Sequence, residues 1–204
     1  MKNEPIKVLY VDDEESNLRS FKANFRRDFD VHLAASAKEA MELLSREPMH
    51  VVISDQRMPG ENGAELLAQV KDKHPSAIRM LLTGYADIEA VIDAVNRGRI
   101  YAYATKPWDP SDLKLRIQQA YEVFRLRDDK EQLLRRYQQI YAASGDPIVI
   151  VNEDGRIIEV NPALEQLIGS DRQVLMQGGL TGLISDMNDL RKALRGRRKG
   201  KSFQ

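Results

Sequence analysis

Two periodicities of apolar and polar positions alternate along the first 125 residues. Short apolar runs bounded by turn residues predict five strands, over residues 6–11, 31–35, 50–54, 78–82 and 99–104. The amphipathic stretches between them predict helices over residues 16–27, 37–46, 64–73 and 88–96. Because strands that alternate with helices at this spacing are joined by right-handed crossovers, we expect an α/β fold with a doubly wound five-stranded parallel sheet.

A long helical pattern follows over residues 111–142, where no proline or glycine interrupts it. Its first part places four apolar residues where they would pack on the sheet: Leu113, Ile117, Ala120 and Phe124. Further positions recur at alternating spacings of three and four: Val123, Leu126, Lys130, Leu133, Tyr137 and Ile140. This spacing is typical of a coiled-coil seam with one polar position, and it also fits a solvated helix with incidental leucines.

The pattern changes again over residues 143–204. Ser144 to Pro147 breaks the helix, and two apolar strands then flank Asn152 to Gly155, which is the signal of a β-hairpin. Asn161-Pro162 follows as a helix cap with proline in the first turn. The remainder supplies more helical pattern but no further convincing strand, so we expect a small α+β segment.

Composition excludes several classes of protein. Lys+Arg and Asp+Glu both number 31, so the formal net charge of zero gives no overall field toward nucleic acid. The absence of cysteine excludes a disulfide framework, a thiolate metal site and a cysteine nucleophile. The acidic N-terminal stretch is unlike a signal peptide, and no segment approaches the length of a membrane span. We therefore expect a cytoplasmic protein with one full domain and part of a second.

Polar residues stand at the carboxyl ends of four predicted strands: Asp12-Asp13, Asp55, Thr83 and Lys106. Taken singly, they could favour a helix N-terminus, cap a turn, or point into solvent. Taken together, they lie on the rim of the sheet where sites collect, and clustered carboxylates repel unless a cation such as Mg²⁺ lies among them. A lysine opposite would help such a site to attract a phosphoryl group, which an aspartate can accept covalently.

Four stretches resemble the receiver domain of two-component response regulators: "VDDEESN", "ISDQRMPGENGAELL", "RMLLTGYAD" and "YAYATKPW". The resemblance covers roughly residues 5–125 and implies a flavodoxin-like receiver domain over residues 1–125. It implies that Asp55 is the phosphoacceptor. It further implies a Mg²⁺ site formed by Asp12, Asp13, Asp55 and the backbone carbonyl of Arg57.

The same resemblance implies how the domain would respond to the phosphoryl group. The hydroxyl of Thr83 and the ammonium of Lys106 would bind its oxygens, Tyr103 would be the switch aromatic, and Pro107 would follow a cis peptide bond. Tyr101 competes for the switch role because alternation places both tyrosines on one face of the strand, so the spacing to Lys106 decides for Tyr103. Gly84 replaces the alanine that is common after the threonine. The domain would also assist hydrolysis of its own phosphoryl group.

Two other hypotheses share this fold. A flavodoxin-type cofactor module needs a phosphate loop rich in Gly, Ser and Thr, whereas "DDEES" would repel the cofactor phosphate. A pseudo-receiver that docks a partner without phosphorylation is the alternative function, although such domains usually lack an acidic residue or the lysine, and all are present here.

Residues 143–204 resemble the start of a PAS domain, truncated before its remaining strands; a generic α+β fragment is the alternative. This segment has neither histidine for haem nor cysteine for a flavin adduct. A basic run near its end (Arg195, Arg197, Arg198, Lys199 and Lys201) has no interleaved aromatic residues, so we expect no direct nucleic-acid binding.

The sequence therefore predicts a response regulator rather than an enzyme. Its partner would be a histidine kinase or a phosphotransfer protein, with no membrane contact. The receiver context favours a homodimer through the long helix, with contacts from Val123, Leu126, Leu133, Tyr137 and Ile140. No kinase, cyclase, phosphodiesterase or DNA-binding motif occurs before Gln204, so an output activity would lie beyond that residue.

Overall fold

A computed structural model describes residues 5–84, 100–179 and 182–185 of the chain. The chain divides into two compact units, Met1–Lys130 and Glu131–Gln204. The helix predicted over residues 88–96 and the basic run near the end lie outside the described residues.

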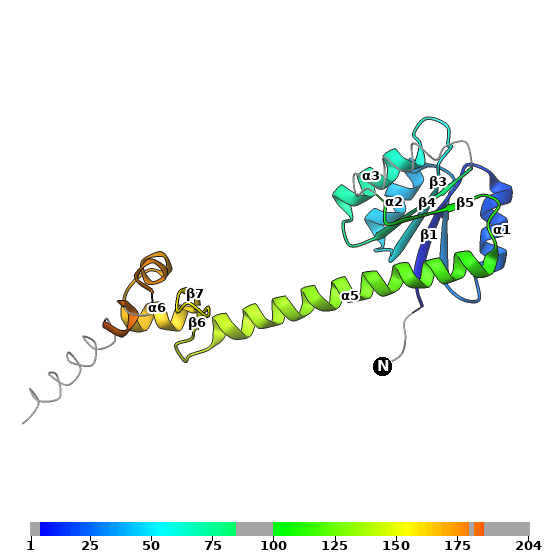
Figure 1. The fold of residues 1–204 in the computed structure, drawn as a ribbon. Coiled ribbons are helices and arrows are strands. Elements are labelled where there is room, and N and C mark those ends of the chain that lie inside the picture. The colour runs from blue at the N-terminus through cyan, green and yellow to red at the C-terminus, as the bar shows by residue number, and fades with distance from the viewer. Residues whose placement is uncertain (1–4, 85–99, 180–181, 186–204) are drawn as a thin grey trace, which may run out of the picture. The chain divides into compact units, whose positions relative to one another are not determined.

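The first unit is a five-stranded parallel sheet with helices on both faces (Figure 1). The strands are β1 (Lys7–Val11), β2 (Asp30–Ala34), β3 (Val51–Asp55), β4 (Ile78–Thr83) and β5 (Ala102–Thr105). Their order is β2-β1-β3-β4-β5, and every pair is parallel. The predicted fold class is confirmed. Differences lie at the ends of elements. The first helix, Glu15–Phe25, stops before the predicted residue 27 because residues 26–28 form a turn. Strand β5 begins at Ala102, later than expected, although the N–H of Tyr101 already bonds the carbonyl of Arg79 at 2.8 Å, and residue 99 lies outside the described residues.

The helices of this unit are α1 (Glu15–Phe25), α2 (Ala37–Arg46), α3 (Gly63–Lys73) and the first half of α5 (Pro110–Ala143). Alternate residues of each strand point to opposite faces of the sheet, so one strand serves two cores. Leu9 and Val11 pack with α2 and α3, whereas Val8 and Tyr10 pack with α1 and α5. The predicted contacts of α5 are confirmed: Leu113, Ile117 and Ala120 are fully buried, and Phe124 packs against the same core.

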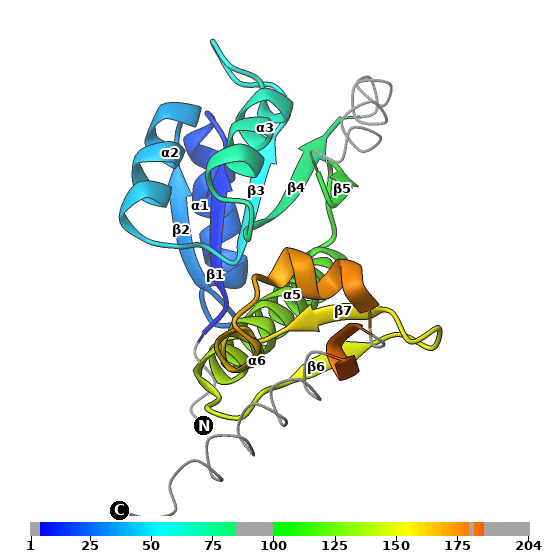
Figure 2. The same cartoon turned by 90° about the vertical axis from the view of Figure 1, so that its left-hand side faces the viewer.

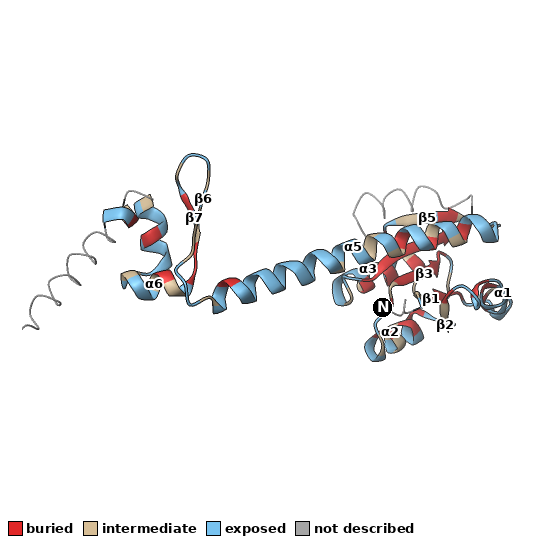
Figure 3. Ribbon diagram, turned by 90° about the horizontal axis from the view of Figure 1, so that it is seen from below, coloured by how far each residue is buried: buried red, intermediate tan, exposed pale blue. Residues whose placement is uncertain are grey.

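Beyond the first unit, α5 continues without interruption to Ala143, in agreement with the predicted long helix. Every residue from 129 to 140 is exposed, as Figure 3 shows by its pale blue colour. No described helix is long and apolar enough to cross a membrane.

The second unit contains the predicted hairpin and capped helix (Figure 2). Strands β6 (Val149–Val151) and β7 (Ile157–Val160) pair antiparallel, and α6 (Pro162–Ile168) follows. Gly155 in the turn and Gly169 at the end of α6 both have positive φ, which glycine adopts without strain. The described residues after α6 are mostly helical and include no further strand. Five buried apolar residues form the core of this unit: Ile157, Val160, Leu164, Leu175 and Leu183.

Candidate phosphoacceptor site

The site is built where β1 and β3 end beside each other. The two strands are paired so that Val11 faces Ser54, which brings Asp12 and Asp55 to the same edge of the sheet. Both carboxylates are buried: Asp12 is 1% exposed and Asp55 is 8% exposed. Because apolar strands covered on both faces carry these residues, two negative charges lie close together in a region of low water content.

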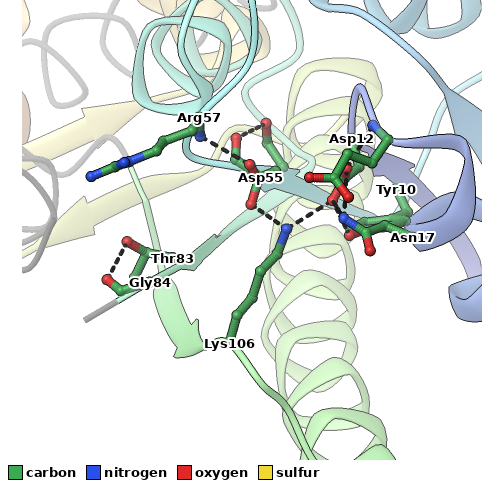
Figure 4. Close-up of polar contacts among 10 residues, drawn as sticks. Tyr10, Asp12, Asn17, Asp55, Arg57, Thr83, Gly84 and Lys106 are labelled. Carbon is green, nitrogen blue, oxygen red and sulfur yellow. Dashed lines mark hydrogen bonds and ion pairs between the residues drawn. The ribbon is translucent and has the colours of Figure 1, made fainter. Parts of the chain in front are cut away.

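Lys106, which follows β5, lies between the two carboxylates (Figure 4). Its Nζ is 2.8 Å from Asp12 Oδ2 and 2.5 Å from Asp55 Oδ1. Burial by itself would lower the pKa of Lys106, but the hydrogen bonds and charges of the two aspartates outweigh it and raise that pKa. The lysine is therefore a permanent positive charge that offsets the repulsion of the carboxylates. The following Lys106–Pro107 peptide bond is cis, as the resemblance implied.

Asp12 is held by more donors than any other side chain of the site. Its Oδ2 accepts from Tyr10 Oη at 2.6 Å and from Lys106, and its Oδ1 accepts from the backbone N–H of Glu14 at 3.0 Å. The amide of Asn17 donates to both oxygens, at 3.0 and 3.1 Å. Burial raises the pKa of the Asp12 carboxyl, but these donors outweigh it and hold the pKa below its usual value. Burial and the hydrogen bond to Asp12 raise the pKa of Tyr10, so its hydroxyl stays a donor.

Asp55 is fixed by the backbone around it. Its Oδ2 accepts the N–H of Arg57 at 2.9 Å, which leaves Oδ1 directed toward Lys106. Gly63, the first residue of α3, lies so close to β3 that a Cβ built on it would be 2.0 Å from the carbonyl oxygen of Asp55. Only glycine lets α3 pack this tightly behind the phosphoacceptor candidate.

Three of the predicted site residues stand apart from this network. Thr83 is buried at the end of β4, and its hydroxyl donates to the carbonyl of Gly84 at 3.1 Å. Tyr103 is 41% exposed on β5, and Tyr101 just before that strand is equally exposed. The side chain of Asp13 is exposed beyond the end of β1.

The two buried carboxylates fit a hard cation, and the exposed Asp13 stands apart from them. The carboxylates of Asp12 and Asp55 supply the oxygen ligands that Mg²⁺ prefers, and Lys106 marks a place between them where positive charge is stabilised. Within the described residues, no three His, Cys, Asp or Glu side chains gather in a metal-binding group. Mg²⁺ commonly keeps several water ligands and takes only one or two carboxylates, so this set is sufficient for it.

The sequence reasoning missed Tyr10, Asn17 and Gly63. Tyr10 could have been found, because alternation along β1 places it on the same side as Asp12. Asn17 belongs to the quoted "VDDEESN" stretch, but nothing in the spacing alone links its amide to Asp12. For Gly63 the sequence shows only the capping box of Asn62 and Glu65, and the close approach to β3 is a property of the packed fold.

Comparison with protein families agrees with the fold and the site. A model of the response regulator receiver domain matches residues 8–118, and a model of a PAS domain matches residues 135–201. The chain therefore belongs to the response regulator receiver family, and a PAS domain follows its receiver domain.

Individual relatives are response regulators. Over 124 residues the chain is 36% identical to the hydrogenase transcriptional regulatory protein HoxA of Bradyrhizobium diazoefficiens, covering 61% of this chain and 26% of HoxA. It is 28% identical over 226 residues to the response regulator protein PilR of Pseudomonas aeruginosa, covering 93% of this chain and 50% of PilR. The chain thus spans between about a quarter and a half of the length of these relatives.

Solved structures resemble the first part of the chain. A response regulator receiver domain from Clostridium thermocellum matches with a TM-score of 0.56 and 30% identity, covering 59% of this chain and 97% of that one. An adenylate cyclase from Rhodopirellula baltica matches with a TM-score of 0.63 and 32% identity, covering 64% of this chain and 98% of that one. Both similarities therefore concern a receiver-sized region.

Proposed function

We propose that Asp55 accepts a phosphoryl group from a phosphohistidine of a partner histidine kinase or phosphotransfer protein. The observation that carries this proposal is the contact of one Asp55 oxygen with Lys106, which in turn contacts the buried Asp12. Membership of the receiver family supports phosphorylation-dependent signalling, and the resemblance of the stretch around Asp55 to the receiver motif supports Asp55 as the acceptor.

In the transfer, an oxygen of Asp55 forms a bond to phosphorus while the bond from phosphorus to the donor imidazole nitrogen breaks. The imidazole leaves with the bonding electron pair, and the product is an acyl phosphate on Asp55. Mg²⁺ held by Asp12, Asp13, Asp55 and the backbone carbonyl of Arg57 would neutralise charge on the phosphoryl oxygens. The N–H of Arg57 orients Asp55 by holding its other oxygen.

The residues around Asp55 would then exchange partners. The ammonium of Lys106 moves from the Asp55 carboxylate to a phosphoryl oxygen. Lys106 thereby gains a new ion pair in place of the one that it loses. The hydroxyl of Thr83 now donates to a neutral carbonyl, and a charged phosphoryl oxygen is a stronger acceptor. Tyr103 is exposed and free of the core, so it can turn inward when Thr83 moves.

A groove beside Lys106 gives the donor access. It is lined by Asn17, Ser20 and Asn24 of α1 and by the residues that follow Lys106, including Trp108 and Pro110. Its polar side chains and indole suit a protein surface rather than a lipid, which supports phosphoryl transfer from a partner protein.

Phosphorylation with a small phosphodonor and Mg²⁺ tests this proposal. Intact-mass measurement should show one added phosphoryl group in the wild type and in the Asp28→Asn control, and none in Asp55→Asn. Lys106→Ala should still be labelled but should lose most of the conformational response. A wild-type chain that stays unlabelled would instead favour the pseudo-receiver, and undiminished labelling of Asp55→Asn would exclude Asp55 as the acceptor.

The signal would leave the receiver through a parallel pair of α5 helices from two copies of the chain. Leu126, Leu133 and Ile140 are spaced by seven and are 64%, 69% and 64% exposed. Val123, Lys130 and Tyr137 are also spaced by seven, so the two sets form one seam. A second copy buries both sets at once, because apolar seams of this period pair with themselves.

Charges next to the seam favour the parallel arrangement. Glu122 and Arg127 are five residues apart, the separation at which the flanking positions of two parallel helices face each other, and they carry opposite charges. Lys130 within the seam weakens the pair, which suits a contact that phosphorylation adjusts. A change in the helix pair at the receiver would then reach the PAS domain along α5.

Light scattering on the full chain tests the pairing. The wild type should be dimeric, and Leu133→Glu combined with Ile140→Glu should give a folded monomer that still accepts phosphate at Asp55. Gln138→Glu with Gln139→Glu adds the same charge outside the seam and should leave the dimer intact. A wild type that is monomeric both with and without phosphorylation would exclude this route.

A further inference from the structure

Tyr10 holds a position in the site that the family resemblance did not predict. Its ring is fully buried under α1 and stacks on Phe21, with ring centroids 4.2 Å apart and planes at 19°. Phe21 in turn contacts Phe25 and Trp108. The ring is therefore held in a packed core, and its hydroxyl donates to Asp12 Oδ2 at 2.6 Å (Figure 4).

The acceptor capacity of Asp12 is fully used. A carboxylate oxygen has two lone pairs, so the group offers about four acceptor sites. Oδ1 accepts from the N–H of Glu14 and from the Asn17 amide, and Oδ2 accepts from Tyr10, from Lys106 and, at 3.1 Å, from the same Asn17 amide. A cation can bind this carboxylate only where one of these donors leaves.

Lys106 is the donor that can leave. Its side chain is 27% exposed, its stem has several rotatable bonds, and it keeps a second partner in Asp55. The phenol of Tyr10 has no comparable freedom, because its ring is packed between β1 and α1. The lone pair that becomes available is therefore the one that faces Asp55, and the lone pair that faces the core stays occupied.

We propose that Tyr10 is a positioning residue for the cation site: its hydroxyl fixes the rotation of the Asp12 carboxylate so that the lone pair released by Lys106 faces Asp55. This inference rests on the proposed function, in which Asp12 and Asp55 share a Mg²⁺ ion. Residues that orient a metal ligand through a hydrogen bond set the affinity without touching the metal.

Titration of the full chain with Mg²⁺ tests the role of Tyr10. Binding is measured from the fluorescence of Trp108, the single tryptophan of the chain. Tyr10→Phe keeps the ring and its stacking on Phe21 and removes only the hydroxyl. We expect its dissociation constant for Mg²⁺ to rise about tenfold, the lower end of the effect of removing a partner of a metal ligand. The increase in melting temperature with Mg²⁺ should shrink in parallel.

Tyr141→Phe is the matched control, because it also removes one buried tyrosine hydroxyl but lies in the second unit. Its dissociation constant should equal that of the wild type. Equal constants in Tyr10→Phe and the wild type would overturn the inference, and so would loss of the folded receiver in Tyr10→Phe, which would make the hydroxyl a folding determinant. A wild type that binds no Mg²⁺ would instead refute the proposed function.

Discussion

In each unit of the molecule a buried polar side chain forms hydrogen bonds with several neighbours, and the two side chains differ in the kind of group that they bind. Asp12 in the receiver is 1% exposed, and Asn161 at the start of α6 is 0% exposed. Asp12 is bound mainly by other side chains: Tyr10, Asn17 and Lys106. Within the part of the chain that the structure describes, the side chain of Asn161 is hydrogen-bonded only to backbone groups.

The partners of Asn161 come from every part of its neighbourhood. Its Oδ1 accepts the N–H of Ile148 at 2.8 Å and that of Leu164 at 3.1 Å. Its Nδ2 donates to the carbonyl of Asp146 at 2.9 Å and to that of Tyr141, in the last turn of α5, at 3.4 Å. One amide therefore joins the end of α5 to the hairpin and to α6.

The Asp12 network is therefore suited to binding a ligand, whereas Asn161 acts as a joint, that is, a fixed connection between α5, the hairpin and α6. Side-chain partners such as Lys106 can rotate away when a cation or a phosphoryl group arrives, so the Asp12 network can change without unfolding. Backbone partners cannot leave Asn161 unless β6 or α6 also moves. Charge supports the same distinction. The negative charge of Asp12 attracts cations, whereas the neutral amide of Asn161 both donates and accepts the hydrogen bonds that its neighbours need.

The largest effect should come from Asn161→Ala. The change removes a helix cap and leaves the buried N–H of Leu164, the partly buried N–H of Ile148 and two carbonyls short of a partner, at about 1–3 kcal/mol for each buried group left unsatisfied. We expect the second unit to lose roughly 3 kcal/mol, read from faster amide hydrogen exchange of Ile148 and Leu164.

The control for this change is Asn152→Ala in the hairpin turn, where the side chain accepts the N–H of Arg156 at a partly exposed position. It should affect exchange near the turn only. Phosphorylation of Asp55 should be unchanged in both variants. Exchange of Ile148 and Leu164 that is equally slow in Asn161→Ala and the wild type would show that Asn161 is not the joint.

Gly63→Ala should break the receiver network from behind, without altering any of its side chains. The new Cβ would overlap the carbonyl oxygen of Asp55 and approach Leu81, so α3 or β3 must shift. Overpacking of this kind costs about 1–3 kcal/mol, and we expect a loss near 2 kcal/mol in denaturant unfolding together with slower labelling of Asp55.

Gly84→Ala serves as the comparison, since no atom of the described residues would lie within 4 Å of its Cβ although it adjoins Thr83. Its stability should stay within about 0.5 kcal/mol of the wild type. If Gly63→Ala is equally mild, the close approach of α3 to β3 does not position Asp55.

These two networks show how far the sequence could predict the molecule. Strand and helix periodicity located the sheet, and the charged residues at strand ends located Asp12, Asp55 and Lys106, because both signals are local. The Asn161-Pro162 cap was also visible. The bonds of Asn161 to Tyr141 and Asp146 were not, because they depend on how the chain returns after Gly145. Gly63 and Tyr10 needed the packed fold for the same reason.

Tyr141→Phe should have a smaller effect and the opposite sign. The Tyr141 side chain is buried, and its hydroxyl has no hydrogen-bond partner among the described residues. A buried hydroxyl without a partner costs free energy, so its removal should stabilise the second unit by about 1 kcal/mol. Tyr10→Phe removes a hydroxyl that is bonded to Asp12 and should destabilise the receiver. Thermal unfolding of both variants at neutral pH measures this difference. A shift of the melting temperature with the same sign in both variants would contradict the prediction.

The smallest effect concerns alkaline pH, where the two buried tyrosines should behave alike. Burial raises the pKa of Tyr10 and of Tyr141 above the ordinary value of about 10, which the unfolded chain keeps. Above pH 10 or so the unfolded chain therefore loses protons that the folded chain retains, and the free energy of unfolding falls as the pH rises. Below that pH neither tyrosine contributes any slope.

Melting temperatures between pH 9 and 11 should fall less steeply in Tyr10→Phe and in Tyr141→Phe than in the wild type. Lys106 adds to the fall in the receiver. Its pKa is raised in the folded chain, so the stabilisation from its charge is lost as the pH rises through the same range. The melting temperature of Tyr10→Phe should therefore fall more steeply with pH than that of the double variant Tyr10→Phe with Lys106→Ala. Equal slopes in the wild type and both phenylalanine variants would show that neither hydroxyl is held in its neutral form by the fold.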